Sequence, residues 1–148
     1  MSLLKWWEIG DVDLSVDFAT LALAPTPNQY LVCPAGECGG QAHRAAPVYE
    51  VPVARLAAAW RQVVAEQPRV EVRSVDEAGS PTALIQRTKL LRFPDLVTVA
   101  FAPLDEGRST LYVYSRSVYG ESDLGVNARR IDAWLARLAE LVGTPTTG

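Results

Sequence analysis

Histidine, cysteine and long apolar runs are all scarce in this chain of 148 residues. Its one histidine is His43, so any nucleophilic mechanism that needs an imidazole base depends on this residue. Two cysteines are too few for a disulfide-built scaffold. No run of about 18 apolar residues is present to span a bilayer, so we expect no transmembrane segment. Neither a glycine-rich phosphate loop nor an HExxH motif occurs, and we expect no cofactor.

An excess of basic charge is absent as well. The chain has 14 basic and 17 acidic residues, which gives a formal net charge of −3. Non-specific nucleic-acid binding needs a basic surface that displaces counterions, so we expect no nucleic-acid partner. Hydrophobic residues make up 49% of the chain, which is typical of a globular domain with its own core.

Loop-forming residues dominate the beginning of the sequence. The stretch APTPNQY, residues 24–30, is rich in proline and asparagine, and CPAGECGGQAH, residues 33–43, contains three glycines. We therefore predict that residues 1–44 form an N-terminal extension and a Cys/His loop packed on the domain. The opening MSLLKWW contains too short an apolar stretch to indicate a signal peptide, so the sequence leaves the compartment open.

Regular structure is predicted for residues 45–143. VYEVP at 48–52 favours a short strand, and the apolar residues that follow Pro52 recur at helical spacing until Pro68. A second helix is predicted from Asp123 to Val142. Between the two helices lie four strand-like runs, at 69–75, 82–93, 96–102 and 109–119.

The connections between these four runs are too short for crossovers and favour hairpins. The predicted fold is therefore α+β. It is a twisted antiparallel sheet in the order strand, helix, four strands, helix, with both helices packed on one face. Residues 144–148 are predicted to form a disordered tail.

Polar residues gather where the last strand meets the last helix. Extended backwards by one turn, the apolar stripe of the helix reaches Asn127 and Arg130. The strand face that carries Leu111 and Val113 continues with Ser115 and Ser117. Two elements on either side of one turn thus lose their apolar residues at the same end.

Three interpretations of this junction stay open. As a structural brace, Asp123 or Ser122 would cap the helix, and the remaining polar groups would bond one another. As a binding site, the helix N-terminus would supply donors for an anion together with Arg116, Arg129 and Arg130. Catalysis is the weakest interpretation, because no activated nucleophile is visible. The candidate ligand-binding residues are Arg116, Ser117, Ser122, Asp123, Asn127 and Arg130.

Cys33, Cys38 and His43 form a second candidate cluster, with C-x4-C-x4-H spacing. Zinc binds thiolate and imidazole ligands, although this spacing matches no established zinc pattern. A disulfide between the two cysteines and a pair of free thiols both stay open, because the compartment decides between them. An enzyme, hydrolase-like or metal-dependent, would have to use this loop.

One strand face carries Tyr112, Tyr114 and Arg116. A soluble monomer seldom leaves a large apolar patch bare, so we expect the N-terminal segment, with Trp6, Trp7 and Phe18, to cover this face.

The stretches LLRFPDLVTVAF and YVYSRSVYGESDLGVNARRIDAWLARL closely resemble the bacterial and plastid family catalogued as domain of unknown function 1499. The hallmark of that family is an Arg- and Ser-rich strand followed by Gly-x-Ser-Asp-x-Gly-x-Asn-x-x-Arg-Ile. Tyr114 and Tyr119 depart from the family pattern. Matching positions here are Gly120, Ser122, Asp123, Gly125, Asn127, Arg130 and Ile131.

The resemblance implies no activity, because the family is uncharacterised. Some members carry an N-terminal membrane segment, which implies the cell envelope as a location, on its cytoplasmic or periplasmic face, if such an anchor has been removed from this chain. The leading hypothesis is a non-enzymatic module that binds a small polar or anionic ligand, or a protein partner, at the strand-to-helix junction. An enzyme that uses the Cys/His loop and a purely structural brace are the competing hypotheses.

Overall fold

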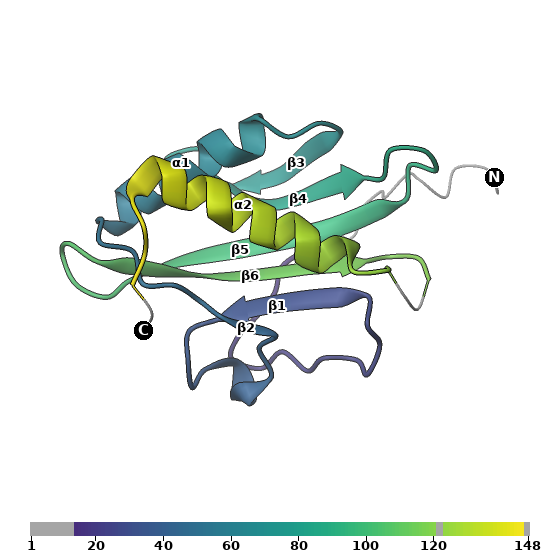
Figure 1. Cartoon of the computed structure of the whole chain (residues 1–148), viewed down its shortest axis with the longest axis horizontal. Helices are drawn as coiled ribbons and strands as arrows, with labels where there is room; N and C mark the ends of the chain where they lie inside the picture. Colours follow the sequence, from purple (N-terminus) through teal and green to yellow (C-terminus); the bar gives the residue numbers. More distant parts are fainter. Residues whose placement is uncertain (1–13, 121–122, 147–148) are drawn as a thin grey trace.

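The chain folds into a six-stranded sheet with two helices on one face (Figure 1). This is a computed structural model, and it describes residues 14–120 and 123–146. The strand order is β2-β1-β6-β5-β4-β3, with β2 parallel to β1 and every other neighbouring pair antiparallel. The α+β class predicted from the short connections is confirmed. The elements are β1 (Gln29–Cys33), η1 (Cys38–Gly40), β2 (Arg44–Ala45), α1 (Val53–Ala65), β3 (Val70–Val75), β4 (Pro81–Arg87), β5 (Pro94–Pro103), β6 (Ser109–Ser117) and α2 (Val126–Val142).

The main core lies between the sheet and the two helices. Val99 of β5 pairs with Val113 of β6, and both side chains are buried beneath the helices. The rings of Trp60 from α1 and Trp134 from α2 pack in a T-shaped arrangement, with their centroids 5.7 Å apart. The apolar stripes of both helices and the inward-facing residues of β5 and β6 thus form this core, whereas Val72 and Val75 of β3 are exposed.

The predicted order of elements is wrong at its start. The first strand is β1, and it pairs with β6 so that Leu31 lies beside Tyr114. Residues 48–52 instead form an extended segment held by two isolated bridges, from Val48 to Thr146 and from Tyr49 to Ser109. β1 has only five residues between loop-forming neighbours, and its pairing with a distant strand decides its conformation. Thr146 lies in the segment predicted to be a tail.

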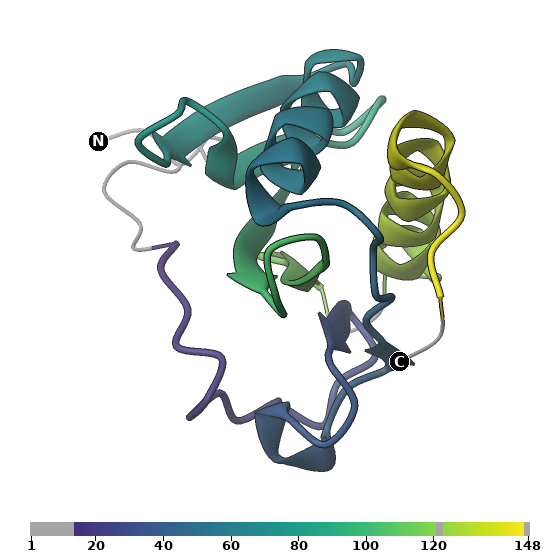
Figure 2. The ribbon, with the colours of Figure 1, turned by 90° about the vertical axis from the view of Figure 1, so that its left-hand side faces the viewer.

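The N-terminal segment runs along the face of the sheet opposite the helices (Figure 2). The Thr98 hydroxyl donates a 2.7 Å hydrogen bond to the carbonyl of Leu14. Further along, the ring of Phe18 packs 5.3 Å from that of Tyr112. Phe18 thus covers this face as predicted, whereas Trp6 and Trp7 lie outside the described residues.

Neither described helix is long and apolar enough to cross a membrane.

Candidate functional site

Asn127, in the first turn of α2, is the centre of the polar junction and is fully buried. Its carbonyl oxygen accepts hydrogen bonds from the Ser115 hydroxyl at 2.6 Å and from Arg130 at 2.8 Å. Its amide nitrogen donates to the Ser117 hydroxyl at 2.9 Å and to the Asp123 carboxylate at 2.7 Å. These bonds use the donor and acceptor capacity of the side-chain amide within the protein.

Asp123 closes the N-terminus of α2. One of its oxygens accepts from the backbone N–H of Gly125 at 2.7 Å, and the other from that of Asn127 at 3.1 Å. Burial works to raise the pKa of Asp123, but the hydrogen bonds from Asn127 and Gly125 outweigh it and lower the pKa below the ordinary value. These two backbone donors are therefore already bonded to a carboxylate.

Arg130 ties the junction to the middle of the sheet. Its guanidinium donates to the carboxylate of Asp95 at 2.6 Å, and the two side chains are only 6% and 4% exposed. The Nε–H donates to the side-chain carbonyl of Gln86 at 2.5 Å. Helix α2 is thus bonded to β5 through Asp95 and to β4 through Gln86.

Arg116 lies on the other face of the sheet. It donates to the Thr98 hydroxyl at 2.9 Å, and its guanidinium lies 4.7 Å from the ring centroid of Tyr114. Burial lowers the pKa of Arg116 to about 10, partly opposed by Tyr114. Arg116 alternates with Ser115 and Ser117 along β6, so the sheet separates it from the junction.

The structure therefore brings together four of the six candidate residues, Ser117, Asp123, Asn127 and Arg130, and leaves Arg116 apart. Ser122 lies outside the described residues. Local sequence reasoning did not find Asp95 or Gln86. Each is a buried polar residue in a largely apolar strand, and its partner Arg130 lies 35 or 44 residues away in the chain. A buried acid in an apolar run is nevertheless a signal that a cation must lie nearby.

A groove of 490 Å³ runs beside the junction, between α2 and the end of β4. We call it the basic groove, because no Asp or Glu of the described residues lines it. Arg69, Arg87 and Arg129 each donate a hydrogen bond to a backbone carbonyl. None of the three forms a salt bridge with a carboxylate in the described part of the chain. Its cationic lining residues are Arg69, Arg87, Lys89, Arg129 and Arg130.

A second pocket of 250 Å³ lies against the basic groove and shares Thr88 and Val126 with it. Phe93 and Tyr119 line this pocket, and their ring centroids are 6.1 Å apart. Asp95 lines the second pocket, whereas Arg130 lines the basic groove. The buried ion pair therefore lies at the boundary between the two hollows.

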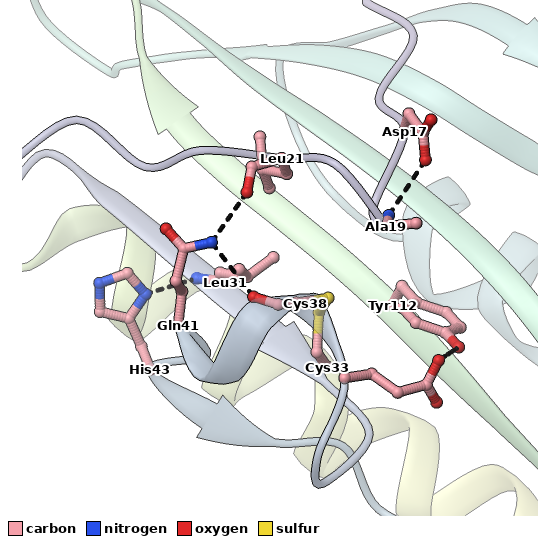
Figure 3. The surroundings of a disulfide bond; sticks show 10 residues. Asp17, Ala19, Leu21, Leu31, Cys33, Cys38, Gln41, His43 and Tyr112 are labelled. Atoms are coloured by element: carbon pink, nitrogen blue, oxygen red, sulfur yellow. Dashed lines mark hydrogen bonds between the residues drawn. A yellow bond between two sulfur atoms is a disulfide. The ribbon is translucent and has the colours of Figure 1, made fainter.

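The Cys/His loop lies at the β1 end of the sheet, where Cys33 and Cys38 form a disulfide (Figure 3). His43 Nδ1 accepts a 2.9 Å hydrogen bond from the backbone N–H of Leu31, and its ring stacks on that of Tyr30. Both sulfur atoms are thus bonded to each other, and one ring nitrogen of His43 is hydrogen-bonded to the backbone. Within residues 14–120 and 123–146, no three His, Cys, Asp or Glu side chains are grouped to hold a metal ion.

A comparison with protein families supports the resemblance that the junction motif indicates. No curated protein and no solved structure shows significant similarity to the chain. A family described as "Protein of unknown function (DUF1499)" matches residues 21–138, which include the disulfide loop, the sheet and most of α2. The family resemblance read from the junction motif is thereby confirmed, and the chain belongs to the DUF1499 family.

Proposed function

We propose that the chain is a non-enzymatic module that binds a small anionic ligand in the basic groove. The observation that carries this proposal is the set of five cationic side chains around one groove, without a lining carboxylate among the described residues. Arg130 is neutralised by Asp95, so the other four supply the uncompensated charge. In a chain of net charge −3, this local excess attracts anions against the overall charge.

The groove is a better candidate than the polar junction itself. Asn127 and Asp123 bond to each other and to the protein backbone, so a ligand would have to break those bonds before it could bind there. A ligand in the groove would meet guanidinium groups that donate to single carbonyls and keep further N–H donors. The junction then acts as the support that fixes α2, and with it Arg129, beside β4.

An enzyme acting through Cys33, Cys38 and His43 is the second candidate. It would need the disulfide opened to give a thiolate, and no feature of the loop geometry favours that step. We therefore place the function in the groove rather than in the loop.

The test is a titration of isotopically labelled protein with inorganic pyrophosphate, followed by NMR. Amide signals of residues 87–89 and 126–130 should shift saturably, and the Lys89→Glu/Arg129→Glu variant should lose the response. Arg55→Glu is the matched control, because Arg55 is also exposed on a helix and donates to a carbonyl, that of Leu141, at 2.9 Å. Equal shifts in the two variants, or none in the native protein, would count against the proposal.

A second variant separates the groove from the junction. Asn127→Ala should lower the free energy of unfolding, because it leaves buried partners unsatisfied at about 1–3 kcal/mol each. Its folded fraction should still bind pyrophosphate in the groove. Loss of binding by a folded Asn127→Ala protein would instead place the ligand at the junction.

A further inference from the structure

Most of the exposed large hydrophobic side chains gather at one end of the sheet. They belong to two segments, residues 88–93 after β4 and the described residues 118–120 and 123–125 after β6, which lie at the same end of the molecule (Figure 1). The backbone N–H of Val118 donates to the carbonyl of Pro94, so the two loops are neighbours. We call the following residues the end patch: Leu90, Leu91, Val118, Tyr119 and Leu124.

Core packing does not account for these side chains. Leu90 is 88% exposed, Leu124 is 84% exposed and Leu91 is 60% exposed. A leucine that keeps most of its surface in water contributes little hydrophobic stabilisation. Several such residues at one end of a molecule mark a surface that meets another apolar phase.

Cations surround the end patch. Lys89 and Arg92 flank the two leucines of the first loop, and Arg129 follows the second loop by one helical turn. Arg87 precedes the first loop at the end of β4. The carboxylates of Asp95 and Asp123, which lie nearby, are bonded to Arg130 and to the start of α2. Among the described residues, the exposed charge beside these leucines is therefore positive.

We infer that the end patch docks this domain onto a bilayer that contains anionic lipids, with a lipid headgroup in the basic groove. Leucines on projecting loops enter the boundary between headgroups and acyl chains, and the neighbouring cations interact with anionic headgroups. The inference rests on the proposed function, because it identifies the anion of the groove as part of a lipid. The end patch lies beside the basic groove, because Lys89 and Arg129 line the groove and are also close in sequence to the leucines of the patch.

Vesicle co-sedimentation tests the inference on the full chain. The protein should sediment with vesicles of phosphatidylglycerol and phosphatidylcholine in equal parts, and not with phosphatidylcholine alone. Leu90→Ser/Leu91→Ser should weaken the partition by about tenfold for each leucine removed from the membrane. Lys89→Ala should weaken it by about fivefold, and added salt should weaken it further.

Leu104→Ser is the matched control. Leu104 is 46% exposed, but it lies in the β5–β6 turn at the opposite end of the sheet, so its replacement should leave vesicle binding unchanged (Figure 1). An equal loss in Leu104→Ser and Leu90→Ser/Leu91→Ser would overturn the assignment of the surface. Circular dichroism should show both variants folded, because none of these side chains belongs to the core.

The two proposals fail differently. If pyrophosphate binds in the groove but neither vesicle type is bound, membrane docking is wrong and the proposed function stands. If the protein binds anionic vesicles through the end patch without any response to pyrophosphate, docking is supported and the groove is not a site for soluble anions. If phosphatidylcholine alone binds the protein equally well, the anionic headgroup is not what is recognised, and the inference is overturned.

Discussion

The guanidinium of Arg130 lies 2.6 Å from the carboxylate of Asp95, and almost no water reaches either side chain. The pair joins the first turns of α2 to β5, and Gln86 adds a bond to β4. Desolvation of two charges is expensive, so such a pair is stable only when its geometry and its other hydrogen bonds are good. Here Asn127 and Ser115 supply those bonds to the same guanidinium.

Breaking this pair should be costly. Asp95→Asn leaves the charge of Arg130 buried without a counter-ion, which should lower the free energy of unfolding by about 3–5 kcal/mol. Urea denaturation measures this change. Asp105→Asn is the matched control, because Asp105 pairs with Arg108 at 2.8 Å on the exposed surface, where the loss of an ion pair should cost far less. Similar costs for the two variants would mean that Arg130 and Asp95 do not form a buried pair.

Asp123 should make stability depend on pH. Its pKa is lower in the folded protein than the ordinary value of 3.8, so its carboxylate stabilises the fold above that value. This stabilisation is lost as the pH falls through the folded-state pKa. The difference in unfolding free energy between the native protein and Asp123→Asn should be constant above about pH 5 and shrink below about pH 4. Urea titrations at a series of pH values measure it, and a difference independent of pH would contradict the role of the carboxylate.

The disulfide between Cys33 and Cys38 should stabilise the β1 end of the sheet. Closing so short a loop lowers the conformational entropy of the unfolded chain, which stabilises the folded state by about 2 kcal/mol. The free energy of unfolding of Cys33→Ala/Cys38→Ala should therefore be lower by that amount, and the variant should unfold at a lower urea concentration. Mass spectrometry checks the bond directly, since reduction adds two hydrogen atoms to the native mass. No change in mass on reduction would show that the purified protein holds free thiols.

The Tyr49→Phe variant should be more stable than the native protein. Its ring is buried in the main core, and its hydroxyl has no hydrogen-bond partner among the described residues. Removing that buried hydroxyl should raise the free energy of unfolding by about 1 kcal/mol. Thermal and urea unfolding both measure the change. Tyr114→Phe is the comparison, because the Tyr114 hydroxyl donates to Gln29 and its loss should destabilise instead. A destabilised Tyr49→Phe protein would reveal a partner for its hydroxyl.

Local periodicity was enough to predict the helices α1 and α2 and the strands β3 to β6. Apolar residues recur at the spacing of the element in both helices and in β3, β5 and β6, so short-range sequence carries the information. Alternation along β6 also separates Arg116 from Ser115 and Ser117, as the structure has it. Two strands, β1 and β2, were not predicted, because they have only five and two residues, too few for a period to be recognised.

The sequence by itself determined the class of the fold and the place where polar residues gather, because both follow from patterns within one element or across one turn. Only the tertiary structure decided that Asp95 meets Arg130 and that cations from β4, α2 and the loops between strands surround one groove. Residues far apart in the chain become neighbours through strand pairing and helix packing. Those contacts depend on the free energy of the whole fold, which no local pattern encodes.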